Sequence, residues 1–235
     1  MVEIVDSKRR RLFGVFGASG LLIAAPALAQ LPLTPKKATN ADDQPIPATE
    51  DLMREHGVAE RILLIYETGI RRVGQGEDIE PAIFTQAGEI MRDFVHDYHE
   101  KSEENFIFPH FKKAGRMVEL VDTLLAQHAA GRKLTERFLQ LAPTANTKEK
   151  RKTMTDTLQA SIALYRPHLA REDTDIFPTV RSLVTSKEFD EISDAMEKAE
   201  RNKFGADGFE KMVKKVAAIE KRIGTNDISQ YTPKT

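Results

Sequence analysis

The chain has 235 residues with 35 basic and 36 acidic side chains, and this near-neutral balance gives no support for nucleic-acid binding. Hydrophobic residues make up 40% of the chain and charged residues 30%, an ordinary composition for a globular protein of one or two domains. The absence of cysteine excludes disulfides, thiolate ligation and iron–sulfur clusters, so any bound metal must take nitrogen and oxygen ligands.

The first 29 residues have the features of a secretory signal peptide. Basic residues 8–11 precede an apolar stretch from Leu12 to Ala25, and Ala27-Leu28-Ala29 matches a signal-peptidase site. Arg10-Arg11-Leu12-Phe13 also fits the twin-arginine pattern, whose export route carries folded proteins. The sequence therefore predicts cleavage after Ala29 and export, to the periplasm in a bacterium. The alternative is an uncleaved membrane anchor, although the apolar stretch is short for a bilayer span.

Residues 30–47 are predicted to form a flexible linker, because they hold four prolines and few large apolar groups. Apolar residues with helical period then predict four long helices at about residues 48–73, 80–109, 115–141 and 148–177. Two shorter amphipathic helices follow at 187–202 and 209–223. Pro109 is predicted to end the second long helix. The expected fold is all-α, an up-down-up-down four-helix bundle over residues 48–180 with a C-terminal helical appendage over 181–235.

One eleven-residue pattern of possible metal ligands occurs twice. His99 to Pro109 and His168 to Pro178 both read His-x3-Glu-acid-x2-Ile-Phe-Pro. Residues four apart lie on the same face of a helix, so each copy presents an imidazole and a carboxylate together. One more histidine, His56 or His128, stands a helix length before each copy. The spacing suggests a helical hairpin repeated with pseudo-twofold symmetry, which would gather all these side chains at one point.

A metal-free bundle with histidines in polar niches of the core is the alternative interpretation. One inward histidine would favour it. Four inward histidines and two inward carboxylates in one layer would instead be costly buried charge unless a cation pairs with them. The pattern therefore favours metal binding.

These features resemble the hemerythrin-like family, also called the HHE cation-binding family, from about Asp51 to Lys214. They differ from the ferritin-like Glu-x-x-His pattern, because no glutamate stands three residues before a histidine. The resemblance implies a four-helix bundle that holds two non-haem iron ions (Fe2+/Fe3+), joined by carboxylates and a bridging oxo or hydroxo group. The implied metal ligands are His56, His99, Glu103, His128, His168 and Glu172.

The resemblance implies open coordination positions as well. Set against two six-coordinate irons, these ligands leave about two positions for water or a small ligand such as O2, NO or peroxide. Animal hemerythrins have a second histidine four residues from the one on the third helix, whereas Leu124 and Arg132 stand there in this chain. Because of this difference, the resemblance gives weaker support for simple reversible oxygen carriage than for metal binding.

The leading interpretation is an exported protein that binds dioxygen or a related small ligand for storage, delivery or sensing. No catalytic residue is assigned. The alternatives are a diiron oxidoreductase acting on NO or peroxide, and iron storage or donation, because these functions can share the same ligands. Nucleic acid is not an expected partner, and no membrane span is expected after signal cleavage.

Several neighbouring side chains remain open in the sequence interpretation. His96 is expected on the polar face of its helix and His110 in solvent. Glu100 is next to His99, and whether a swing of its side chain makes it an additional bridging carboxylate is left open. Tyr165 either lines the metal pocket or packs in the core, while Glu104 and Asp173 are expected outside the ligand set.

Overall fold

The computed structural model describes residues 46–234, and this part of the chain is helical with no strand. The predicted signal peptide and all but the last two residues of the predicted linker lie outside the described residues. The α-helices are α1 (Ala48–Gly74), α2 (Pro81–Ile90), α3 (Glu100–Ser102), α4 (Phe108–Ala114), α5 (Val118–Leu141), α6 (Lys148–Arg171), α7 (Phe177–Val180), α8 (Ser186–Phe204) and α9 (Gly208–Ile223). Three π-helical segments, η2 (Met91–His99), η3 (Glu103–Ile107) and η5 (Glu172–Ile176), and two 3-10 turns, η4 (Ala142–Thr144) and η6 (Ile228–Tyr231), complete the described elements.

Helix ends follow local chemistry. In α1, Glu50 and Asp51 lie in the first turn and Arg71 and Arg72 in the last, which matches the helix dipole. At the start of α8, Thr185 and Glu188 form a capping box, with the Thr185 hydroxyl accepting from the Glu188 backbone N–H at 3.2 Å. These ends agree with the sequence predictions to within a few residues.

The second long helix does not end at Pro109, contrary to the sequence prediction. It passes through η2, α3 and η3 and continues as α4, with Pro109 in the first turn of α4. Proline is tolerated there because the N–H that it lacks needs no partner in a first helical turn. Pro178 has the same place in α7, directly after η5.

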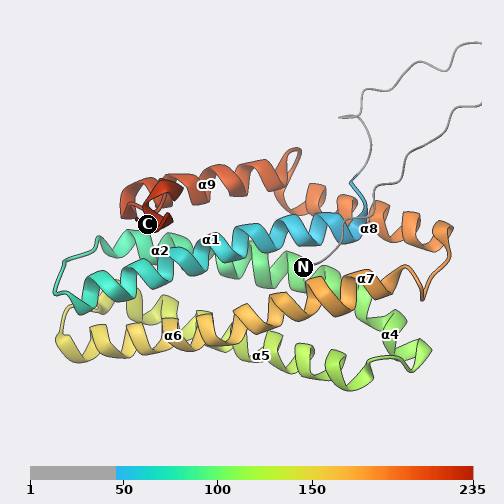
Figure 1. Cartoon of the computed structure of the whole chain (residues 1–235), viewed down its shortest axis with the longest axis horizontal. Coiled ribbons are helices and arrows are strands. Elements are labelled where there is room, and N and C mark those ends of the chain that lie inside the picture. Colours follow the sequence, from blue (N-terminus) through green and yellow to red (C-terminus); the bar gives the residue numbers. More distant parts are fainter. Residues whose placement is uncertain (1–45, 235) are drawn as a thin grey trace, which may run out of the picture. The chain divides into compact units, whose positions relative to one another are not determined.

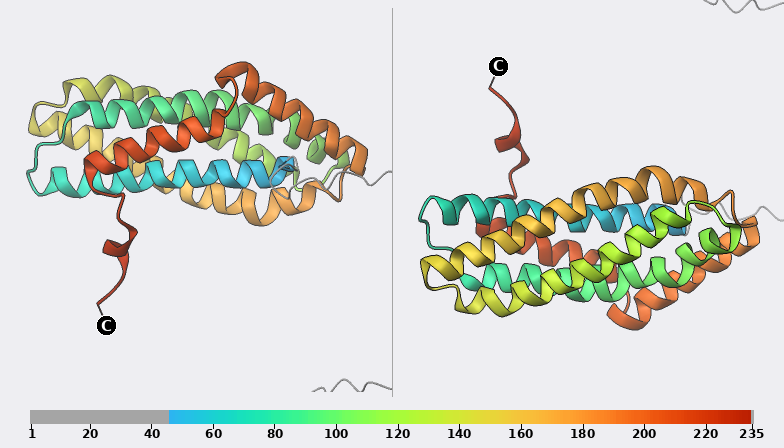
Figure 2. Two further views of the ribbon diagram at one scale, coloured as in Figure 1. Left: turned by 90° about the horizontal axis from the view of Figure 1, so that it is seen from above. Right: turned by 90° about the horizontal axis from the view of Figure 1, so that it is seen from below.

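The long helical segments lie alongside one another (Figures 1 and 2). Helix α6 packs against both α1 and α5, and η2 packs against the same two helices. Helix α9 packs on α1 and α2. Helix α8 contacts the beginning of α1, where the Ala48 N–H donates to the Ser193 hydroxyl. Among residues 46–234, none of the helices combines the length and apolar character that crossing a membrane requires.

The apolar core is divided into two clusters. One cluster includes Leu52, Ile107, Phe108 and Ile176, and the other includes Ile62, Phe138 and Leu158. The first cluster precedes His56 in α1 and follows Glu103 and Glu172 in their helices. A layer of buried polar side chains therefore lies between two apolar clusters, where water has little access.

Candidate metal centre

The layer contains all six residues that the repeated pattern singled out. His56 comes from α1, His99 and Glu103 from the second helical segment, and His128 from α5. His168 lies in the last turn of α6, and Glu172 begins η5. Each of the six is at most 3% exposed. Three groups have ligand atoms that lie within 4.8 Å of one another inside the group. They are His56 with His99, Glu103 and Glu172 (the four-residue group), His128 with His168 and Glu172 (the three-residue group), and His128 with Glu100 and Glu104.

The two carboxylates lie between the imidazoles. Glu103 Oε1 is 3.5 Å from His99 Nε2, and Glu103 Oε2 is 3.4 Å from His128 Nε2. Glu172 Oε2 is 3.4 Å from His56 Nε2 and 3.1 Å from His168 Nε2. The first hairpin is α1 with the helical segment from α2 to α4, and the second is α5 with the segment from α6 to α7. Each glutamate thus reaches one histidine of each hairpin, as a carboxylate shared between two ions would.

Each of the four imidazoles forms a hydrogen bond through its Nδ1 atom, on the side of the ring away from Nε2. The partners of His56 and His99 are Asp173 Oδ1 at 2.8 Å and Glu55 Oε2 at 2.7 Å. The partners of His128 and His168 are Glu104 Oε1 at 3.1 Å and Gln127 Oε1 at 3.0 Å. An oxygen acceptor at Nδ1 fixes the ring orientation and leaves Nε2 free to bind a metal, the arrangement typical of metal-ligating histidines.

Within residues 46–234, five of the atoms that face the centre of the layer lack hydrogen-bond partners. Both oxygens of Glu103, both oxygens of Glu172 and Nε2 of His128 are buried in this state. His56 Nε2 and His99 Nε2 face each other at 3.0 Å. Buried acceptors of this kind are costly unless a cation lies among them, so the donor set fits metal ions with nitrogen and oxygen ligands.

Comparison with protein families decides the classification. The hemerythrin HHE cation-binding domain matches residues 48–180, more than half of the chain. The chain belongs to the hemerythrin HHE cation-binding family. The hemerythrin domain therefore implies cation binding, and its buried histidine and glutamate clusters fit a metal site.

The similarity to relatives extends beyond the hemerythrin domain. Proteins of Mycobacterium bovis and of two strains of Mycobacterium tuberculosis, described as uncharacterized proteins, are each 40% identical to the chain over 232 residues. The match covers 96% of this chain and 91% of each relative, so it includes the C-terminal helices. No solved structure is significantly similar to the chain.

Protonation in the metal-free hemerythrin domain reflects the crowding of acceptors. Burial alone would lower the pKa of His56, but its hydrogen bond to Asp173 and the nearby carboxylate of Glu172 raise it to about 10. Burial opposes charge on His128 too, yet Glu103 and Glu104 raise its pKa to about 12. Protons would thus occupy part of the space between the carboxylates when no metal is bound.

Glu55 and His99 form a different pair. Burial, with Asp51 nearby, raises the pKa of Glu55 well above its usual value, and burial lowers the pKa of His99 to about 4. His99 is therefore a neutral imidazole at pH 7. A cation bound at His99 Nε2 favours the form with the proton on Nδ1 and the negative charge on Glu55.

His96 lies inside the hemerythrin domain, and its expected place on the polar face was wrong. It is 1% exposed, with Nδ1 2.9 Å from Glu100 Oε1 and Nε2 2.8 Å from the Thr135 hydroxyl. The reason is η2, whose wide turns change which residues face inward relative to an α-helix. Glu100 is also 1% exposed, and Arg132 Nη2 lies 2.8 Å from its Oε2.

Tyr165 joins this second polar cluster. Its hydroxyl donates to Glu100 Oε1 at 3.0 Å, and its ring lies edge-on to His168 with 5.8 Å between centroids. A Cβ at Gly131 would lie 1.9 Å from the Tyr165 hydroxyl, so glycine makes room for it. The sequence interpretation of Tyr165 as a pocket residue is consistent with this position.

Sequence reasoning did not find Glu55 and Gln127. Each directly precedes a leading histidine, Glu55 before His56 and Gln127 before His128. The repeat places both at the same position of the motif, and this is the feature that would have found them.

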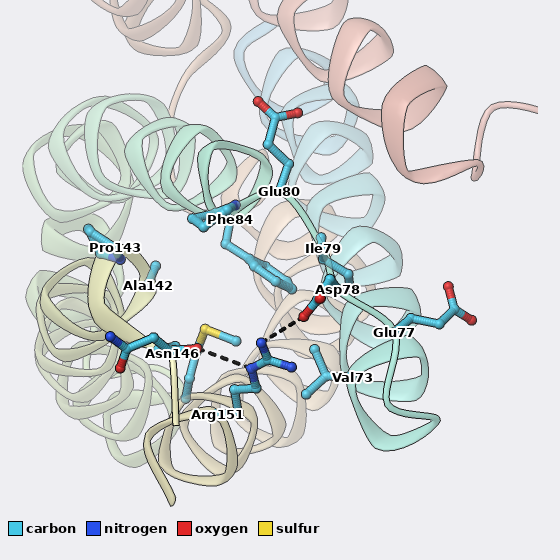
Figure 3. Close-up of a pocket in the computed structure, with 13 residues that line it drawn as sticks. Val73, Glu77, Asp78, Ile79, Glu80, Phe84, Ala142, Pro143, Asn146 and Arg151 are labelled. Carbon is cyan, nitrogen blue, oxygen red and sulfur yellow. Dashed lines mark hydrogen bonds and ion pairs between the residues drawn. The ribbon is translucent and has the colours of Figure 1, made fainter. Parts of the chain in front are cut away.

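A surface pocket of about 360 Å³ lies elsewhere in the hemerythrin domain (Figure 3). It is formed where α1 ends, α2 begins and α6 begins, and its lining includes Val73, Phe84 and Met154. Arg151 bridges it by donating to Asp78 Oδ1 at 2.7 Å and to the Ala145 carbonyl at 3.2 Å (Figure 3). None of the six residues of the polar layer lines this pocket.

Proposed function

We propose that the chain is a hemerythrin-like protein with a non-haem diiron centre that binds dioxygen or a related small ligand. The proposed metal ligands are His56, His99, Glu103, His128, His168 and Glu172. The observation that carries the proposal is the set of buried ligand atoms on Glu103, Glu172 and His128 that have no hydrogen-bond partner within residues 46–234 and face one another from both hairpins. An up-down-up-down four-helix bundle with a C-terminal helical appendage is the topology that this proposal assumes.

The burial of the layer favours a ligand of diatomic size. Phe108 stacks on His128 with 5.6 Å between ring centroids, and Phe177 lies 5.3 Å from His56. Both phenylalanines are 1% exposed. A bulky substrate would have to displace this packed shell, whereas O2 or NO needs only small side-chain motions.

The residues around the centre have separate tasks in this function. Asp173, Glu55, Glu104 and Gln127 orient the four imidazoles through Nδ1. The aromatic shell excludes bulk water and strengthens the electrostatic interactions inside. The iron ions would supply the redox chemistry and the open coordination positions.

Metal content and oxygen exposure test the proposal. Mature protein reconstituted with Fe2+ under anaerobic conditions should contain about two metal equivalents, because the ligand set serves two ions. A new absorption band that appears with O2 and disappears when O2 is removed supports ligand binding. One equivalent or less after reconstitution would contradict the dinuclear centre. Rapid, irreversible oxidation with turnover would favour an oxidoreductase.

Export is a second part of the proposal. Residues 1–29 carry the twin-arginine-type signal, and that route accepts proteins that have folded with their metal. Loading in the cytoplasm followed by export to the periplasm suits a centre buried as deeply as this one.

A further inference from the structure

The Nδ1 partners of the four histidines follow the sequence repeat. In each hairpin, the residue before the leading histidine holds the later histidine of the same hairpin. Glu55 Oε2 is 2.7 Å from His99 Nδ1, and Gln127 Oε1 is 3.0 Å from His168 Nδ1. These two contacts are equivalent in position but not in charge, because a carboxyl group in one hairpin is replaced by an amide in the other.

The remaining two partners cross between the hairpins. The acid that follows each repeated glutamate holds the leading histidine of the other hairpin. Glu104 Oε1 is 3.1 Å from His128 Nδ1, and Asp173 Oδ1 is 2.8 Å from His56 Nδ1. Glu104 and Asp173 are both acidic, so any electrostatic difference between these two contacts comes from the charged side chains around each acid.

Arg132 makes the surroundings of Glu104 more positive than those of Asp173. Its Nη2 atom is 2.6 Å from Glu104 Oε1, and Lys101 Nζ is 2.5 Å from Glu104 Oε2. Arg132 stands four residues after His128, and the equivalent position after His56 holds Glu60. The positions related by the repeat thus carry opposite charges.

The two groups of ligands therefore have unequal electrostatic support. His56 and His99 of the four-residue group are backed by Asp173 and Glu55, two carboxyl groups. In the three-residue group, His168 is backed by the neutral Gln127, and the acid behind His128 already pairs with two cations. A more negative partner at Nδ1 makes Nε2 a stronger donor to a metal, and fixed cations nearby oppose a second positive ion.

We propose that the two groups bind a divalent transition-metal ion unequally and in a fixed order, and that Gln127 and Arg132 set the difference. The first ion binds the four-residue group. The ion at the three-residue group is weaker and exchangeable, so a single-ion form is a stable species when metal is scarce. This proposal rests on the proposed dinuclear function and adds to it a response to metal supply.

Titration of the metal-free full chain with Co2+ alone, under anaerobic conditions, tests the order. Co2+ takes the same nitrogen and oxygen ligands and reports each binding step by its visible absorption and by calorimetry. Two steps should appear, with dissociation constants that differ by about tenfold or more, the size of effect that residues behind a metal ligand produce. Two indistinguishable steps in the unmodified protein would overturn the proposal.

Exchange of the partner residues gives the sharper test. Gln127→Glu should tighten the second step by about tenfold and leave the first step unchanged. Glu55→Gln should weaken the first step by a similar factor, and the double exchange should bring the two constants together or reverse them. Arg132→Gln should also tighten the second step, because it frees Glu104, and it serves if Gln127→Glu does not fold.

Gln140→Glu is the matched control, because it adds the same charge on an exposed position of α5. It should change neither step. An equal effect of Gln140→Glu and Gln127→Glu would overturn the proposal, since the net charge would then be the cause. Failure to bind two Co2+ ions under any condition would instead contradict the dinuclear function on which the proposal rests.

Discussion

Glu103 and Glu172 are at positions where an ionised carboxylate loses its solvation by water, at a large cost in free energy. Both are fully buried, and neither oxygen of either side chain has a hydrogen-bond partner within residues 46–234. Nearby His168, His128 and His56 outweigh burial and hold the pKa of Glu172 well below its usual value. An ionised carboxylate in this setting is stabilised only by cations, either protonated imidazoles or metal ions.

Removal of either glutamate is predicted to abolish the dinuclear centre. Glu103→Ala and Glu172→Ala each delete a carboxylate that reaches histidines of both hairpins. Metal that binds only the folded state stabilises it by mass action, so both variants should melt near the temperature of the metal-free protein. Metal analysis and thermal melts with and without Fe2+ measure this.

His110→Ala is the control for that pair, because His110 belongs to none of the candidate ligand groups. It should retain the full metal content and the metal-dependent rise in melting temperature. A glutamate variant that kept two irons and wild-type melting would show that the His-x3-Glu assignment is wrong at that position.

At the scale of elements, the π-helical segments decide which side chains face the centre. Glu103 begins η3 and Glu172 begins η5, and both segments have five residues at equivalent places of the repeat. Segment η2 has no equivalent, since α6 is α-helical up to Arg171. The extra π turns of η2 explain why His96 and Glu100 are buried although an α-helical reading puts them outside. π-Turns are rare and occur frequently at functional sites.

Contact between α5 and α6 at Tyr165 gives a prediction about stability. Gly131→Ala would place a Cβ 1.9 Å from the Tyr165 hydroxyl and 2.7 Å from its ring, inside a packed core. The change should lower the free energy of unfolding by about 1–3 kcal/mol or more, as overpacking does. Urea denaturation of the metal-free protein measures it.

Gly57→Ala is the matched control within a helix. Gly57 lies in α1 on an exposed position, and a Cβ there has no neighbour within 4 Å. Alanine should raise the free energy of unfolding by about 0.4–1 kcal/mol, because it restricts the unfolded chain. If both substitutions changed the free energy of unfolding by the same amount, the close approach of Tyr165 to α5 would not explain why position 131 is a glycine.

At the scale of the whole molecule, metal binding is predicted to be coupled to proton release. The pKa of His56 is raised to about 10 and that of His128 to about 12, so both are protonated at pH 7 in the metal-free protein. A metal needs neutral imidazole, so binding two ions at pH 7 should release about two protons from these two histidines. Apparent affinity should therefore rise with pH, steeply up to about 10, where His56 loses its proton unaided, and less steeply from there to about 12, where His128 does.

Calorimetry in buffers of different ionisation enthalpy measures the number of protons released. Metal uptake without proton release at pH 7 would contradict the assignment of His56 and His128 as ligands.

Export is predicted to depend on the guanidinium groups of Arg10 and Arg11. Replacing both with lysine should leave the uncleaved precursor in the cytoplasm, because lysine cannot reproduce the planar donor fork of arginine. Cell fractionation with detection of the precursor measures this. Replacing Lys8 and Arg9 instead is the control, and unchanged export of the Arg10/Arg11 variant would indicate the general secretory route.

The sequence by itself determined the helical segments and the convergence of six side chains. The helical segments follow from local periodicity, whereas the convergence follows from the repeated motif and its resemblance to the hemerythrin-like family. The His-x3-Glu spacing survives the π turns because each glutamate stands where its π turn begins. The apolar residues on either side of each ligand were readable in the same way, since helical period separates inward from outward positions.

Only the tertiary structure decided which residues contact the Nδ1 atoms of the ligating histidines. His96 turned inward because π turns are a response to packing that local propensity does not record. The contacts of Asp173 with His56 and of Glu104 with His128 join different hairpins, so they exist only once the hairpins pack together. The same packing brings Arg132 onto Glu104 and makes two halves of similar sequence electrostatically unequal.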